Sequence, residues 1–240
     1  MSEQPSLLPE EAPPDPVMLA SVAARRGSDG HFDELLGRVA VAGAPRGSPD
    51  ALWQRFFNAN GVAGWQDMAN RAARIQRRVK EDGATYNVFD DAGQSAREWP
   101  LETLPMLIGP DEWPHIEQGV AQRAAMLNAV LADVYGERSL LDEGLLPASL
   151  VFAHPQYLRA MHGCVPLGGI HLHVVAFDLA RGPDGLWWVV GQRTQAPSGL
   201  GYLLENRLIV AQQFPEAFRG LKVQRLAASF QGLLQGLLLL

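Results

Sequence analysis

Residues 185–207 read Gly185-Leu-Trp-Trp-Val-Val-Gly-Gln-Arg-Thr-Gln-Ala-Pro-Ser-Gly-Leu-Gly-Tyr-Leu-Leu-Glu-Asn-Arg207, and this stretch decides the prediction of the fold. An apolar run leads into a polar Arg-Thr-Gln cluster, a Pro-Ser-Gly-x-Gly turn follows, and a segment with charged side chains comes last. A strand, a tight glycine turn and the start of a helix form a layout that proteins use to hold phosphate. The stretch therefore predicts a strand, a phosphate-binding turn and a helix over residues 200–212.

A partner strand is predicted just before this stretch. The run Gly169-Ile-His-Leu-His-Val-Val-Ala-Phe-Asp-Leu is strand-like, and Arg181-Gly-Pro-Asp-Gly185 is a good hairpin turn. Asp178 is the only carboxylate of the run and lies near its end, which suits a ligand for a hard cation. The alternative is that Asp178 caps the turn or pairs with Arg181.

Composition narrows the class of protein. The chain has 240 residues, of which 47% are hydrophobic, enough for a substantial core. Its net charge is −6, and four acidic residues lie in the first 15 positions, so the rest is nearly neutral and a basic nucleic-acid surface is not expected. A single cysteine, Cys164, fits a reducing compartment. With neither a secretory leader nor a membrane span expected, the sequence predicts a cytoplasmic protein.

Three regions are expected along the chain: a disordered tail over residues 1–30, a mainly helical region over 31–150, and an α/β part over 151–240. Residues 1–16 hold five of the 17 prolines and cannot bury enough surface to fold. A helical first half and a hairpin in the second half make α+β the expected fold class.

Several helices are predicted from caps and from apolar spacing. Ser48-Pro49 reads as a helix start, and an amphipathic helix runs from Trp65 to Val79 and stops at Asp82-Gly83. Asp111 can cap a long helix that closes at Tyr135-Gly136, and residues 145–160 suggest a strand followed by a loop. A last helix starts at Gln224 and runs into four leucines without a cap, so the chain looks cut off there.

Basic residues lie on one face of the helix predicted from Trp65 to Val79. They are Arg71, Arg74, Arg77, Arg78 and Lys80. Such a cluster could meet phosphate or an acidic partner, and the simpler interpretation is a solvated helix face.

The candidate site centres on the glycine turn. Arg193 can bind phosphate through its guanidinium fork, and Ser198 and Gly199 leave backbone N–H groups free at the helix start. Gly199 and Gly201 allow an anion to approach the backbone closely. A plain turn is the alternative. Glu205 and Asn206 point about 100° apart on a helix, and Glu205 is expected to orient Arg193 or Arg207, although capping and salt-bridge roles explain this triplet as well. Neither a zinc site nor a cysteine nucleophile is expected from five further residues, because they lack CxxC or HxxxH spacing. They are His154, His162, Cys164, His171 and His173.

The chain resembles the circularly permuted ATP-grasp proteins, type 2 in particular, over roughly residues 31–230. The two most specific matching motifs are Phe177-Asp-Leu-Ala-Arg-Gly-Pro-Asp-Gly185 and the stretch from Arg193 to Arg207. Further matching motifs are Asp82-Gly-Ala-Thr-Tyr-Asn-Val-Phe89, Trp99-Pro-Leu-Glu-Thr-Leu-Pro105, Glu112-Trp113, Gln122-Arg-Ala124, Asp133-Val-Tyr-Gly136 and Gly144-Leu-Leu-Pro147.

The resemblance implies ATP and magnesium as cofactors, and a small-molecule or peptide carboxylate as substrate. Such enzymes turn a carboxylate into an acyl phosphate, which an amine then attacks. On that basis Asp178 is the expected metal ligand. The expected cofactor-binding residues are Gln192, Gln195, Ser198, Gly199 and Gly201. The expected catalytic residues are Arg193, Glu205, Asn206 and Arg207.

The sequence departs from the family pattern in two ways. Gly191 and Arg193 stand where relatives carry Glu and Asn as further metal ligands, and neither can coordinate magnesium. Gln192 stands where an Asp is common. Family members also continue for several hundred residues, so this chain is expected to be an N-terminal portion that lacks turnover alone. The alternative is a non-catalytic module that docks on a partner protein through its apolar C-terminal helix, without nucleic acid or membrane.

Overall fold

The computed structural model describes residues 28–41, 49–83, 85–86 and 97–238. Contacts divide the chain into two compact units, which are described separately. The first unit comprises residues 1–107, 181–186 and 199–229, and the second comprises 108–180, 187–198 and 230–240. The predicted tail largely lies outside the described residues, and the predicted boundaries at 31 and 150 remain predictions.

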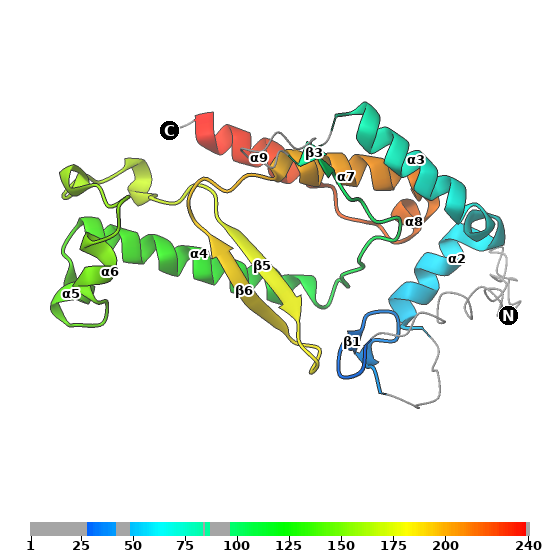
Figure 1. The fold of residues 1–240 in the computed structure, drawn as a ribbon, viewed down its shortest axis with the longest axis horizontal. Coiled ribbons are helices and arrows are strands. Elements are labelled where there is room, and N and C mark those ends of the chain that lie inside the picture. Colours follow the sequence, from blue (N-terminus) through cyan, green and yellow to red (C-terminus); the bar gives the residue numbers. More distant parts are fainter. Residues whose placement is uncertain (1–27, 42–48, 84, 87–96, 239–240) are drawn as a thin grey trace, which may run out of the picture. The chain divides into compact units, whose positions relative to one another are not determined.

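Helices dominate the first unit (Figure 1). They are α2 (Ala51–Gln66), α3 (Met68–Glu81), α7 (Leu200–Gln213) and α8 (Pro215–Gly220). Two antiparallel pairs of short strands accompany them: β1 (Phe32–Asp33) with β2 (Arg38–Val39), and β3 (Thr85–Tyr86) with β4 (Arg97–Glu98). Helix α2 contacts α8, and α3 lies alongside α7, so segments far apart in sequence form one helical layer.

The helix start predicted at Ser48-Pro49 is wrong by two residues. Helix α2 begins at Ala51, and its N-cap is Asp50, whose Oδ2 accepts a hydrogen bond from the Leu52 N–H at 2.9 Å. A carboxylate is a strong N-cap acceptor, and it lies just past the proline that suggested an earlier start. The helix is broken internally at Gly61, where φ is 62°.

The periodic segment from Trp65 to Val79 spans two helices rather than one. Trp65 belongs to α2, and Asp67 separates α2 from α3. The rest of the prediction is confirmed, because Ile75 and Val79 are buried and α3 stops before Asp82-Gly83.

An aromatic core holds the first unit together. Phe56 lies 5.3 Å from Phe214 between ring centroids, and Phe57 lies 4.8 Å from Trp65. Phe214 is fully buried and joins α7 to α8, since it is the C-cap of one and the N-cap of the other. A smaller cluster of Ile75, Val79 and Ile209 fixes α3 to α7. Burial of each large side chain contributes roughly 1.5–3 kcal/mol, so these contacts position α7 firmly.

The second unit is built on one long helix and a β-hairpin (Figure 1). Its elements are α4 (Trp113–Tyr135), α5 (Ser139–Asp142), α6 (Ala148–Phe152), the 3-10 turns η1 (Arg159–Met161) and η2 (Leu167–Gly169), and the strands β5 (Ala176–Arg181) and β6 (Trp187–Arg193). Helix α9 (Leu226–Leu238) has residues in both units.

The predicted hairpin and the predicted end of α4 are confirmed. Gly136 closes α4, and glycine is required there because a Cβ would lie 2.7 Å from the Ala132 carbonyl oxygen. The cap at the other end is Glu112 rather than the predicted Asp111.

The strand predicted within residues 145–160 is wrong. Helix α6 follows Pro147, which ends the preceding turn in an extended conformation, and the turn η1 comes after it. Short apolar runs do not distinguish strand from helix.

Strand β5 begins at Ala176, seven residues later than predicted. The Asn128 side chain of α4 binds the segment ahead of it, because its Oδ1 accepts from the His171 and Leu172 N–H groups at 2.7 and 3.1 Å. These backbone groups are therefore engaged outside a strand ladder.

The architecture confirms the expected α+β class: helices predominate, and each sheet in the described part of the chain is a two-stranded antiparallel pair. Across the described residues, no helix is both long and apolar enough to cross a membrane.

Candidate functional site

An open hollow of about 330 Å³ lies at the start of α7. It is lined by Gly83, Gly199, Gly201, Tyr202 and Glu205. Gly199 is the N-cap with φ 120°, a conformation that disfavours other residues, and it makes no side-chain cap. The first N–H groups of α7 have no partner within the helix, so the hollow offers backbone donors. The predicted glycine turn and helix start are confirmed as local structure, and the predicted role in phosphate binding stays a prediction.

Glu205 brings a carboxyl group to this hollow. Its pKa is raised, first because the carboxyl shares a hydrogen bond with Asp82, and then because of partial burial and the nearby Asp82 charge. Arg78 moderates this effect, and its Nε lies 2.8 Å from Asp82 Oδ2. Glu205 therefore contacts the end of α3, which the sequence did not predict. Glu205 itself therefore keeps its proton to a higher pH than an ordinary glutamate would.

Aromatic side chains lie behind the same helix turn. Trp99 stacks on Tyr202 with ring centroids 4.5 Å apart, and its indole Nε1 donates to Asn206 Oδ1 at 3.0 Å. Asn206 therefore helps to hold the Trp99 ring against Tyr202. Arg207 lies over the Phe218 ring at 5.5 Å, and burial lowers the pKa of its guanidinium. As predicted from their adjacency, Glu205 and Asn206 have different partners.

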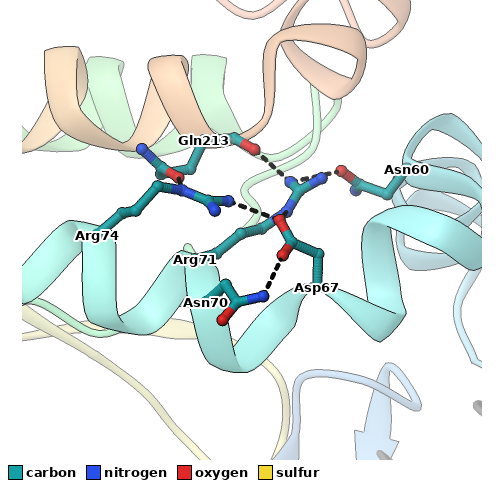
Figure 2. Close-up of polar contacts among 6 residues, drawn as sticks. All are labelled: Asn60, Asp67, Asn70, Arg71, Arg74 and Gln213. Atoms are coloured by element: carbon teal, nitrogen blue, oxygen red, sulfur yellow. Dashed lines mark hydrogen bonds and ion pairs between the residues drawn. The ribbon is translucent and has the colours of Figure 1, made fainter.

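Two arginines on the basic face of α3, Arg71 and Arg74, have protein partners (Figure 2). Arg71 has a side chain only 13% exposed, donates to the backbone oxygen of Gln213 and to Asn60 Oδ1, and lies 4.7 Å from the centre of the Phe214 ring. Arg74 donates to Gln213 Oε1 at 2.9 Å and to Asp67 Oδ2 at 2.6 Å. The interpretation of a solvated face is therefore wrong for Arg71, whose role is to connect α3 to the end of α7.

The second unit brings Asp178 and Arg193 together. Arg193 Nη2 donates to Asp178 Oδ1 at 2.6 Å, and the two side chains are 63% and 48% exposed. A Cβ on Gly191 would lie 2.8 Å from Asp178 Oδ2, so positions 191 and 193 both face the Asp178 carboxylate. The predicted alternative partner, Arg181, pairs instead with Glu34 at 2.8 Å.

These residues do not fit a magnesium ion. One Asp178 oxygen is engaged by a guanidinium, and position 191 supplies no ligand. Magnesium requires several oxygen ligands in octahedral geometry. Within the described residues, no group of three or more His, Cys, Asp and Glu side chains is placed to hold a metal ion.

The cysteine and two of the histidines of the second unit are exposed or bound to backbone groups. Cys164 is a free, exposed thiol. His162 Nδ1 lies 3.0 Å from the Tyr135 carbonyl oxygen, and His154 Nδ1 accepts from the Gln156 N–H at 3.3 Å. The remaining predicted binding residues of this unit, Gln192, Gln195 and Ser198, are exposed.

The predicted site residues thus form two groups. The group in the first unit comprises Gly199, Gly201, Glu205, Asn206 and Arg207, and the group in the second comprises Asp178, Gln192, Arg193, Gln195 and Ser198. Sequence reasoning missed Asp82 and Trp99 as neighbours of α7. Both residues open sequence motifs that resemble the family, and these motifs were the signal that could have identified them.

Taken together, the chain is an α+β protein with a glycine-lined hollow at a helix start and a charged hairpin. Residues 105–240, more than half of the chain, match the family described as circularly permuted ATP-grasp type 2. The chain belongs to this family, whose members generally use ATP and magnesium.

Relatives described as "uncharacterized protein" extend the match toward the N-terminus. One from Mycobacterium tuberculosis is 34% identical over 227 residues, which covers 83% of this chain and 26% of the relative. One from Synechocystis is 32% identical, covering 65% and 32%, and one from Mycobacterium leprae is 30% identical, covering 78% and 31%. The chain therefore spans only about a quarter to a third of these relatives.

Proposed function

We propose that this chain contributes the N-terminal portion of an ATP-dependent carboxylate–amine ligase. The observation that carries the proposal is the family membership together with the glycine-lined hollow at the start of α7. Free backbone N–H groups at a helix start favour an anionic ligand such as a phosphate chain.

The proposed chemistry has two steps. A substrate carboxylate oxygen attacks the γ-phosphorus of ATP, ADP leaves, and an acyl phosphate forms. An amine nitrogen then attacks the acyl carbon and loses a proton, and the C–O bond breaks to release inorganic phosphate, which carries that proton away. Positioning and charge stabilisation dominate such phosphoryl transfers, so the role proposed for this chain is to hold ATP.

Within the hollow, the N–H groups at the start of α7 would bind phosphate oxygens. Asn206 accepts from the Trp99 indole, which stacks on Tyr202, so both contacts position this helix turn. Glu205 would meet the ligand best in its protonated form, because an ionised carboxylate repels phosphate. We assign no magnesium to Asp178, and we propose that the chain alone does not turn over.

The test is thermal unfolding of the 240-residue chain with and without ATP, in the presence and absence of Mg²⁺. A ligand at 100 times its Kd adds about 2.7 kcal/mol of stability. For a chain of this size, we expect the Tm to rise by roughly 5–10 °C. An unchanged Tm would contradict ATP binding.

Two glycine substitutions locate the site. A Cβ on Gly201 or on Gly119 would meet nothing within 4 Å, and both residues are helical. Gly201→Leu places a side chain in the hollow and is expected to remove the ATP-induced shift. Gly119→Leu, on α4, is the matched control and should retain it. If Gly201→Leu also retained the shift, the nucleotide would bind elsewhere.

The proposed inactivity of the chain alone has its own test. It would be contradicted if the wild-type chain hydrolysed ATP and Asp178→Ala abolished that hydrolysis.

A second candidate function is a non-catalytic module that docks on a partner protein through α9. None of its described side chains is buried, and Leu234, Leu237 and Leu238 are exposed, the last at 85%. A row of exposed leucines favours association. A cooperative melt that ATP leaves unchanged would favour this alternative.

A further inference from the structure

The hairpin β5–β6 carries a positive charge where the family resemblance places a metal ion. Asp178, Gly191 and Arg193 are the three positions concerned. Arg193 Nη2 lies 2.6 Å from one carboxylate oxygen of Asp178, and a Cβ at position 191 would lie 2.8 Å from the other. The three positions therefore meet at one point, although neither glycine nor arginine can ligate a metal ion.

Arg193 is an obstacle to a divalent ion at this point. A guanidinium stays protonated at any physiological pH and cannot donate an electron pair to a metal. An incoming cation would compete with it for Asp178 and would be repelled by it. Gly191 adds no ligand that would offset this competition.

We propose that Arg193 replaces the divalent cation in this chain. Its guanidinium supplies a permanent positive charge beside Asp178, and the hairpin binds neither Mg²⁺ nor Mn²⁺ at this position. The charge on Arg193, unlike that of a bound ion, is therefore independent of metal supply and of chelators. The inference concerns the hairpin alone and holds whether or not the hollow at α7 binds ATP.

The test restores oxygen ligands and measures Mn²⁺ binding to the 240-residue chain by electron paramagnetic resonance. The wild type should show no saturable binding up to about 1 mM, and Gly191→Glu with Arg193→Asn should bind Mn²⁺ with a Kd at least about tenfold below that limit. Adding Asp178→Asn to that double variant should remove the gain. The new Glu side chain has room, because it displaces only the end of the flexible Asp178 side chain.

Arg193→Glu alone is the second variant, since it adds a carboxylate without a new Cβ at position 191. The same Asp178-dependent gain in Mn²⁺ binding is expected from Arg193→Glu. Near-ultraviolet circular dichroism checks that each variant is folded. Stoichiometric Mn²⁺ binding by the wild type that Asp178→Asn abolishes would overturn the proposal. A lack of gain in a folded variant would overturn it too, because the three positions would then not form a cation site.

Discussion

Arg71 and Arg193 are both paired arginines, but their surroundings differ. Arg71 is 13% exposed and binds a backbone oxygen, an amide and an aromatic ring, whereas Arg193 is 63% exposed and binds one carboxylate. Removing a buried donor leaves its acceptors without a partner, whereas water replaces an exposed one. Arg71, which is largely covered, therefore maintains the fold, whereas the exposed Arg193 is available for the chemistry of a site.

The largest expected effect is on stability, from Arg71→Met. The variant keeps the apolar stem but leaves the Gln213 carbonyl and the Asn60 amide without their donor, which costs about 2 kcal/mol of unfolding free energy. Urea unfolding followed by tryptophan fluorescence measures this loss. Arg77→Met is the control, because Arg77 is exposed on the same helix, and it should change stability by less than about 0.5 kcal/mol. Equal losses in the two variants would contradict the assigned role of Arg71.

A smaller effect is expected from acid, through Asp67 in the same network. Its pKa lies below the ordinary 3.8, chiefly because Arg74 and Asn70 donate hydrogen bonds to its carboxylate. A lowered pKa in the folded state means stability that is present above pH 3.8 and is lost as the pH falls through the folded value. Asp67→Asn should therefore flatten the decline in stability on acidification below pH 4. A wild type and variant that declined in parallel would show that the network does not hold Asp67 ionised.

The smallest expected effect on stability is from Arg193→Met. Exposed ion pairs contribute about 0–1 kcal/mol, and salt screens them, so the variant should lose less than about 1 kcal/mol, and less still in high salt. The same unfolding assay at two salt concentrations measures it. A loss as large as that of Arg71→Met would remove the distinction between the two arginines.

Local features of the fold were predictable from sequence. The hairpin and helix α7 follow from a turn of fixed composition and from a glycine-rich helix start, which act within a few residues. The end of α4 at Gly136 follows for the same reason. Asp178 could be selected as a notable carboxylate because it stands in an apolar strand.

Contacts between distant segments were not predictable. Arg71 binds Gln213, 142 residues away, and the spacing of basic residues on α3 says nothing about that partner. Glu205 was expected beside Arg193 or Arg207, whereas Asp82 is its principal neighbour. Helix α6 was missed because Pro147 and a short apolar run also fit a strand.

Phe214 has a consequence for evolution of the hollow. It fixes the far end of α7, and a helix of this length is about 21 Å long, so a rotation of about 5° at Phe214 displaces Gly199 by about 2 Å. The residues of the aromatic core do not line the hollow, yet their substitution can therefore change its width. Selection on ligand preference would act on core residues such as Phe56 as well as on the residues that the ligand meets.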